Sequence, residues 1–172
     1  KNRLQNDVPA LAIAKNLIDE GCNVVMFDFR NCGISEGTLT SVGQYEVRDL
    51  LGAVDYVQSQ PELNQKIILM GFSMGASTAI LAGAREPAVS AVIADSPFAD
   101  LRTYLNENLS VWSELPSFPF NQAFFIVVPQ FTGLRPETVS PITEISQLSG
   151  RKLLLIHGDA DVDIPISNSE TL

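Results

Sequence analysis

Two kinds of apolar pattern alternate along the chain. Short runs rich in β-branched, aromatic and other apolar residues predict buried strands. Longer stretches with apolar residues three and four positions apart predict amphipathic helices. The predicted strands are residues 24–29, 66–70, 89–94 and 152–156, and the predicted helices are residues 8–20, 42–60 and 74–85. This alternation indicates the α/β class, with a mainly parallel sheet, helices on both of its faces and right-handed crossovers.

The segment between the third and fourth predicted strands does not follow this alternation of strands and helices. Eight of the chain's thirteen aromatic residues (9 Phe, 3 Tyr and 1 Trp in all) lie between Pro97 and Pro141. Two interpretations remain open. The segment is either an ordinary helical crossover with an apolar face, or a small cap whose aromatic side chains form an apolar substrate pocket. In the second case residues 97–140 are an insertion within one domain that comprises residues 1–172.

Length and charge narrow the class of protein. A chain of 172 residues suits one domain with one well-buried core. Its formal net charge of -9, from 11 Lys+Arg and 20 Asp+Glu, argues against nucleic acid or an anionic membrane as partner. No apolar run approaches the roughly 18 residues that a membrane-spanning helix needs. One His and two Cys without a C-x-x-C spacing predict no metal site, and Cys22 and Cys32 are expected to be reduced thiols of a cytoplasmic protein.

A candidate nucleophile follows the second predicted strand. Residues 71–75 read Gly-Phe-Ser-Met-Gly and fit the pattern G-x-S-x-G, between a buried strand and a helix rich in small residues. A Ser in such a turn has a strained backbone, so Gly71 and Gly75 are expected to remove Cβ atoms that would clash. The Ser73 hydroxyl then lies at the start of a helix, where the backbone amide of Met74 is placed to stabilise a developing oxyanion.

Three further motifs accompany this turn. Residues 28–35 resemble a D-x-R-x-x-G-x-S loop, residues 95–98 a D-S-P-F run, and residues 157–165 the motif H-G-x-x-D-x-x-V/I-P. With these four motifs in order, the chain resembles the α/β-hydrolase-fold serine hydrolases. It is similar to their esterase-like branch, with the Bem46-like and serine-aminopeptidase-like hydrolases.

The resemblance implies a partial α/β-hydrolase fold that lacks the family's first strands and its last strand. In the family, the strand that would precede Lys1 lies between residues 24–29 and 66–70. We therefore expect a gap there, closed by pairing of those two strands or filled by another segment. The loop that supplies the family's second oxyanion amide also lies ahead of Lys1, as does any membrane anchor found in this branch.

The loop after the first predicted strand is interpreted as structural. Asp28 and Arg30 are expected to form a charge pair that braces the turn. Gly33 is expected to supply a left-handed backbone angle.

The same resemblance places the acid of a catalytic triad at Asp161, after the last predicted strand. Asp95, at the end of the third strand, is the alternative acid. In this fold the order along the chain is Ser, acid, His, yet the single histidine, His157, precedes Asp161. We therefore expect His157 to shape the acid loop or pack against the nucleophile turn, and the catalytic histidine to lie beyond Leu172.

Together these residues predict a serine hydrolase. It cleaves carboxylic esters or related acyl bonds of a small-molecule substrate through an acyl-enzyme at Ser73, without a cofactor. Because the general base lies outside the chain, these 172 residues alone are expected to turn over little ester. The alternative is a non-catalytic α/β-hydrolase-like module that binds a small ligand or a partner.

Overall fold

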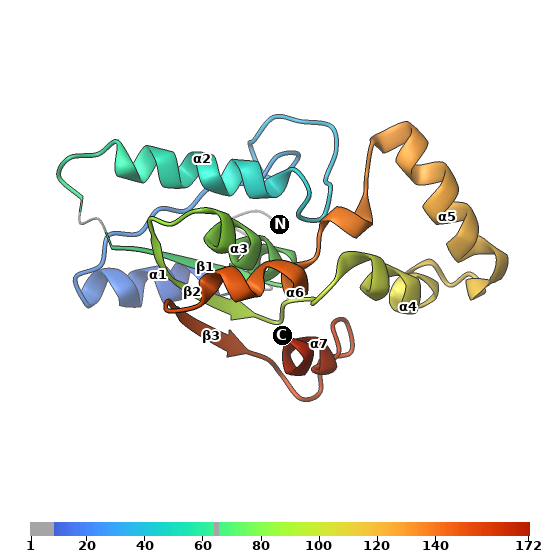
Figure 1. The fold of residues 1–172 in the computed structure, drawn as a ribbon. Helices are drawn as coiled ribbons and strands as arrows, with labels where there is room; N and C mark the ends of the chain where they lie inside the picture. The colour runs from blue at the N-terminus through green and yellow to red at the C-terminus, as the bar shows by residue number, and fades with distance from the viewer. Residues whose placement is uncertain (1–8, 64–65) are drawn as a thin grey trace.

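The computed structural model describes residues 9–63 and 66–172. Its strands form a small sheet with helices packed around it, and a pair of helices projects to one side (Figure 1). In chain order the elements are α1 (Ala10–Asp19), α2 (Glu46–Gln58), β1 (Ile67–Phe72), α3 (Met74–Arg85), β2 (Val89–Asp95), α4 (Leu101–Ser113), α5 (Ser117–Thr132), η1 (Pro136–Thr138), α6 (Pro141–Glu144), η2 (Ile145–Leu148), β3 (Lys152–Ile156) and α7 (Ser167–Thr171).

Most predicted elements are confirmed with small changes of boundary. Helix 74–85 and strand 152–156 have their predicted limits. Helix 8–20 corresponds to α1, although Val8 lies outside the described residues. Helix 42–60 begins only at Glu46, because the preceding residues form turns in which Val42 has a φ of 53°.

The three strands form one parallel sheet in the order β1-β2-β3. Asp95 of β2 aligns with Phe72 of β1 and with Ile156 of β3, so the three strands end at one level. The carboxyl ends of parallel strands share an edge, and the loops that leave this edge are where such folds build their sites. The predicted α/β class and parallel sheet are therefore confirmed.

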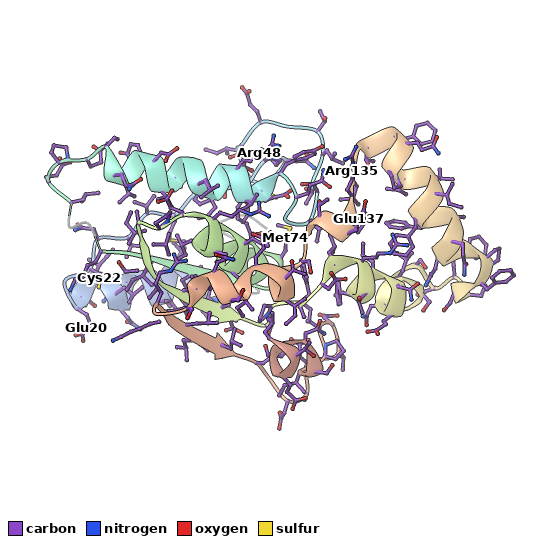
Figure 2. All side chains as sticks on the ribbon, viewed as in Figure 1. Glu20, Cys22, Arg48, Met74, Arg135 and Glu137 are labelled. Atoms are coloured by element: carbon purple, nitrogen blue, oxygen red, sulfur yellow. The ribbon has the colours of Figure 1, made fainter. Side chains whose placement is uncertain are left out.

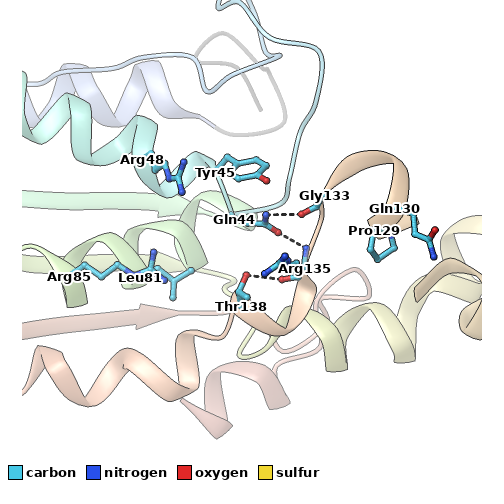
Figure 3. A pocket seen from close by; sticks show the side chains of 11 residues that line it. Gln44, Tyr45, Arg48, Leu81, Arg85, Pro129, Gln130, Gly133, Arg135 and Thr138 are labelled. Carbon is cyan, nitrogen blue, oxygen red and sulfur yellow. Dashed lines mark hydrogen bonds between the residues drawn. The ribbon is translucent and has the colours of Figure 1, made fainter. Parts of the chain in front are cut away.

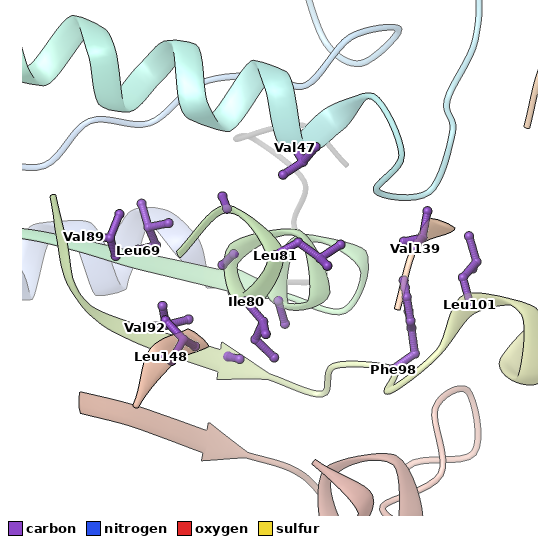
Figure 4. Packing of buried hydrophobic residues seen from close by; sticks show 14 of the residues in the cluster. Val47, Leu69, Ile80, Leu81, Val89, Val92, Phe98, Leu101, Val139 and Leu148 are labelled. Atoms are coloured by element: carbon purple, nitrogen blue, oxygen red, sulfur yellow. The ribbon is translucent and has the colours of Figure 1, made fainter. Parts of the chain in front are cut away.

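Helix α3 forms the centre of the core. It packs on β1 and β2 on one side and against α2 on the other (Figure 4). Ile80 and Leu81 of α3 are almost fully buried, as are Val89 and Val92 of β2. The opposite face of the sheet is covered less completely. There α1 lies behind β1 in Figure 1, and Ile68 remains 57 % exposed.

The strand predicted for residues 24–29 is wrong. These residues form no strand, and among the described residues β1 pairs only with β2. An apolar run favours an extended chain, but a strand also needs a hydrogen-bonded neighbour, and here none is present. Of the two expected ways of closing the gap, pairing of residues 24–29 with residues 66–70 therefore does not occur. Instead the segment is held by packing, with the rings of Phe27 and Phe29 edge to face at 5.1 Å between centroids.

The expected charge pair in the next loop is also wrong. Arg30 pairs with Asp49 of α2, at 2.6 Å between Nη2 and Oδ1, and not with Asp28. One Asp28 carboxylate oxygen instead accepts a hydrogen bond from the Ile34 amide at 3.3 Å. The left-handed angle predicted for Gly33 is confirmed by a φ of 57°, and a Cβ there would collide with the Asp28 carboxylate.

Residues 97–140 contain a helical hairpin, α4 and α5, which projects from the sheet (Figure 1). Figure 2 shows side chains spread along the outer side of α5. The Asn121 side chain ties α5 to α4 by donating to the Asn106 carbonyl at 2.7 Å. Phe118 and Phe131 of α5 are 76 % and 86 % exposed, while the Trp112 side chain lies outside the described part of the structure. The hairpin thus presents apolar surface to its surroundings.

A buried carboxylate fixes the turn ahead of α2. Glu46 is fully buried, and its two oxygens accept hydrogen bonds from the Ser41 amide, the Ser41 hydroxyl and the Gly43 amide at 2.5–2.8 Å. Buried charges are rare unless they are satisfied in this way. Glu46 therefore holds the loop of residues 42–45 in place.

Replacing Glu46 by Ala is expected to lower the free energy of unfolding by about 2–5 kcal/mol. The substitution leaves three buried donors without an acceptor, each costing about 1–3 kcal/mol before the loop relaxes. Urea unfolding at pH 7 measures the loss. Glu107→Ala, at an exposed position on α4, is the control. Equal midpoints for the two variants would show that the buried carboxylate does not hold the loop.

Candidate active site

Ser73 occupies the sharp junction between β1 and α3. Its φ and ψ are 54° and -125°, a conformation that non-glycine residues rarely adopt. Its amide donates to the Asp95 carbonyl at 2.8 Å, and its carbonyl accepts from the Ala76 amide at 2.9 Å. The strained residue is thus held from the neighbouring strand and from the first turn of its own helix.

The two glycines of the motif have different roles. A Cβ on Gly71 would collide with the backbone of Gly75, so the strand and the helix approach each other too closely for any side chain at position 71. The steric requirement predicted for Gly71 is confirmed. For Gly75 it is wrong, since a Cβ there would meet only Phe29, at an ordinary 3.9 Å.

A cavity of about 330 Å³ opens beside Ser73. Its walls come from the loop before α2, the start of α3, the segment after β2, helix α4 and the loop after β3. The lining residues are Val42, Ser73, Met74, Phe98, Tyr104, Asp163 and Ile164. The wall is mainly apolar, with the Ser73 hydroxyl among its polar groups.

Several of these lining residues were not predicted. Phe98 lies in the 95–98 motif and Asp163 in the 157–165 motif, but neither motif singles them out. Nothing in the sequence indicates Val42. Phe98 and Tyr104 are aromatic residues of the 97–140 segment, for which the cap interpretation predicts a place in the pocket wall. The Tyr104 ring stacks on Phe98 at 5.7 Å, and its hydroxyl donates to the Asp163 carbonyl at 2.9 Å. Burial, reinforced by two nearby carboxylates, raises the pKa of Tyr104, so it remains a hydrogen-bond donor.

Met74 is the first residue of α3 and also lines the cavity. The first amides of a helix have no intrahelical carbonyl to bind, and the helix dipole adds partial positive charge at this end. Figure 2 shows Met74 near the middle of the molecule, where α3 begins. An oxyanion formed next to Ser73 would therefore meet a helix N-terminus.

Asp161 lies in the loop after β3, where its carboxylate organises the turn. One oxygen, Oδ1, accepts from the amides of Asp163 and Ile164, both at 2.9 Å. Burial acts to raise the pKa of Asp161, but hydrogen bonds from Ile164, Ser96 and Asp163 outweigh it and leave the pKa below its ordinary value. Asp161 is thus held as an anion, although it is not among the residues that line the Ser73 cavity.

The alternative acid, Asp95, lies at the end of β2, one residue before Ser96. The Ser96 hydroxyl is 3.3 Å from Asp95 Oδ1 and also bonds to Asp161, so it lies between the two candidate acids. Asp95 contacts the nucleophile turn through its backbone, since its carbonyl accepts from the Ser73 amide. Its side chain does not line the cavity.

His157 anchors the acid loop. Only 3 % of its side chain is exposed, and both of its ring nitrogens are engaged. Nε2 lies 2.7 Å from the Ile164 carbonyl, which can only accept, so Nε2 carries the proton. Nδ1 then accepts from the Ser169 hydroxyl at 2.6 Å. The prediction that His157 shapes the acid loop is confirmed, and neither nitrogen is available to Ser73.

Residues 9–63 and 66–172 offer neither a metal site nor a membrane-spanning helix. These residues contain no group of three His, Cys, Asp or Glu side chains that could hold a metal ion. Nor do they contain a helix that is long and apolar enough to cross a membrane.

The lowered pKa of Asp161 predicts a pH dependence of stability. A carboxylate with a depressed pKa stabilises the fold above its ordinary pKa, and this contribution is lost as the pH falls through the folded-state value. At pH 7, Asp161→Asn should therefore lower the free energy of unfolding by about 1–3 kcal/mol, and the difference from the wild type should shrink toward pH 3. Urea unfolding across this range tests it, with the exposed Asp159→Asn as control. A difference that is constant with pH would contradict the assignment.

Relatives of this chain are found among both sequences and structures. It is 36% identical over 157 residues to the Bacillus subtilis (strain 168) protein YqkD, covering 90% of this chain and 51% of YqkD. It is 33% identical over 160 residues to YfhR of Escherichia coli (strain K12), covering 91% and 49%. Both are described as uncharacterized. The chain thus spans about half the length of the curated relatives it matches.

The fold is similar to that of a solved esterase. The Pyrococcus furiosus esterase Pf2001 superposes with a TM-score of 0.72 at 27% sequence identity, over 99% of this chain and 61% of that chain. Together with the strand–turn–helix at Ser73, this likeness shows an α/β-hydrolase fold.

The family itself is shown by the sequence. Residues 1–120, well over half of the chain, match the family model of the X-Pro dipeptidyl-peptidases. This chain therefore belongs to the X-Pro dipeptidyl-peptidase (S15) family, with the fold of the α/β hydrolases.

Proposed function

We propose that the protein is a serine hydrolase that cleaves carboxylic esters or related acyl bonds through an acyl-enzyme at Ser73. The observation that supports this most strongly is the backbone of Ser73, held at a φ of 54° between β1 and α3 and bordering a cavity of about 330 Å³. Strained residues of this kind persist where the surrounding structure enforces them, and they cluster at active sites.

The reaction runs in two steps. The Ser73 hydroxyl gives its proton to a general base while its oxygen attacks the acyl carbon, and the carbonyl electrons move onto an oxyanion next to the Met74 amide. When these electrons return, the bond to the leaving alcohol breaks, and the alcohol takes the proton from the base. Water then attacks the acyl-enzyme by the same route and releases the acid and free Ser73.

The general base is a histidine from another part of the full-length protein. His157 is unsuited to the role because both of its nitrogens are engaged within the acid loop. Asp161 is the acid that would orient the base. Its Oδ1 accepts from two backbone amides, and its Oδ2, which lies 3.7 Å from His157 Nε2, is the oxygen that the imidazole of the base would contact. Asp95 is the second choice, because its own backbone carbonyl accepts the hydrogen bond from the Ser73 amide.

The acyl group of the substrate lies against the apolar part of the cavity wall. Val42, Phe98 and Ile164 are apolar residues of this wall, which favours a small molecule with a hydrocarbon acyl chain over a nucleic acid. Residues 97–140 act as a cap, since Phe98 and Tyr104 of this segment already face the cavity. The exposed phenyl rings of α5 are available to extend the apolar surface. A cytoplasmic location is part of this proposal, since two cysteines in a chain of 172 residues are too few for a disulfide-stabilised secreted scaffold.

Reaction with a fluorophosphonate probe tests the nucleophile. The full-length protein should be labelled and should hydrolyse p-nitrophenyl acetate. Ser73→Ala should abolish labelling and lower kcat at least about a thousandfold, because no other group can form the acyl-enzyme. The exposed Ser59→Ala is the matched control and should behave as the wild type.

Two results would overturn the proposal in different ways. Labelling retained in folded Ser73→Ala would mean that another residue is the nucleophile. A folded full-length wild type that neither labels nor hydrolyses any acyl substrate would instead favour the non-catalytic binding module.

A further inference from the structure

A second and larger cavity, of about 630 Å³, is lined in part by the loop of residues 42–45 (Figure 3). Val42 faces the Ser73 cavity, whereas the next residues of the loop, from Gly43 to Tyr45, line this second one. The cavity is therefore distinct from the candidate active site, although the two share a loop. Its volume falls within the range of small-molecule sites and exceeds what a single inorganic ion would fill.

Three arginines from three different elements converge on this cavity. Arg48 comes from α2, Arg85 from the end of α3, and Arg135 from the link between α5 and η1. Figure 3 shows Arg48 and Arg85 on one side, and Arg135 reaching toward them from the other. The whole chain has 11 Lys+Arg against 20 Asp+Glu, so three cations around one cavity contrast with its net charge of -9.

Two of these three positive charges have no counterion among the described residues. Arg85 forms two hydrogen bonds with the Glu144 carboxylate, at 2.6 and 2.7 Å. Among the described residues, neither Arg48 nor Arg135 forms an ion pair. Arg48 lies over the ring of Tyr45 instead, 5.5 Å from its centroid. Like charges brought together without counterions repel each other, so this arrangement favours a bound anion.

The cavity wall is also held in place. The Gln44 side chain donates to the Gly133 carbonyl at 3.0 Å and accepts from the Arg135 amide at 2.5 Å (Figure 3). This clamp joins the loop ahead of α2 to the foot of α5 and fixes the backbone that carries Arg135. Guanidinium groups present paired donors that match the oxygens of phosphates and carboxylates.

We propose that this cavity binds a small organic polyanion with phosphate or carboxylate groups, held by Arg48, Arg85 and Arg135. Such a ligand would contact α2 and α3 with one part and the foot of α5 with another. It would thereby join the helical hairpin to the sheet domain. Binding does not depend on the chemistry at Ser73.

Isothermal titration calorimetry of the purified protein at low salt tests the proposal. Pyrophosphate and citrate are the two probes, and at least one should bind with a Kd below about 1 mM. Binding of pyrophosphate alone would identify a phosphorylated ligand, and binding of citrate alone would identify a polycarboxylate. Binding of both would show that the site recognises negative charge without distinguishing phosphate from carboxylate. Arg48→Gln and Arg135→Gln should each weaken binding at least tenfold.

Two controls separate this site from other effects. Arg102→Gln removes the same charge from α4, where Arg102 lies 4.9 Å over the Phe125 ring, and should leave the Kd within twofold. Ser73→Ala should also bind normally, so failure of the proposed hydrolase function would not affect this result. The proposal is overturned if neither probe binds, if Arg48→Gln and Arg135→Gln bind as the wild type, or if Arg102→Gln weakens binding as much as they do.

Discussion

The turn at Ser73 depends on one close approach, between the backbone of Gly71 and that of Gly75. Because no side chain separates these two glycines, the end of β1 and the start of α3 lie almost in contact, and the chain reverses direction at Ser73. That residue must then adopt a φ of 54°. Its strain is borne by the core, since β1 is paired with β2 and Ile80 of α3 is completely buried. The exposed chemistry of the site is therefore a consequence of packing beneath it.

From this turn, hydrogen bonds run along the carboxyl edge of the sheet to the acid loop. The Asp95 carbonyl accepts from the Ser73 amide, and the Ile156 carbonyl accepts from the Ser96 amide, each at 2.8 Å. His157, the next residue, continues the series by holding the acid loop from within. Most of these links involve backbone atoms, so the register of the strands sets how the nucleophile and the candidate acids lie relative to each other.

Local pattern was sufficient where the apolar periodicity of an element is continuous between clear end signals, even for β3, in which Leu154 remains 51 % exposed. Helix 74–85 and strand 152–156 have their predicted bounds, and the turn at Ser73 follows from two glycines and a Ser in sequence. Prediction failed where the local structure depends on a partner that is distant in the sequence. Residues 24–29 have the composition of a strand but no neighbour to pair with. Arg30 bonds to Asp49, nineteen positions away, because α2 passes over its loop. Val42 lines the cavity and has a φ of 53°. Because β-branched residues rarely adopt a positive φ, the sequence does not predict this conformation.

The loop of residues 42–45 relates the two cavities physically. From inside the protein, the buried Glu46 carboxylate holds it through hydrogen bonds to Ser41 and Gly43. From outside, Gln44 joins it to Gly133 at the foot of α5. The hairpin therefore cannot shift without carrying this loop or breaking the Gln44 bonds, and Val42 at its start borders the Ser73 cavity. This short backbone segment therefore connects the two cavities physically, because Val42 lines one of them and residues 43–45 line the other.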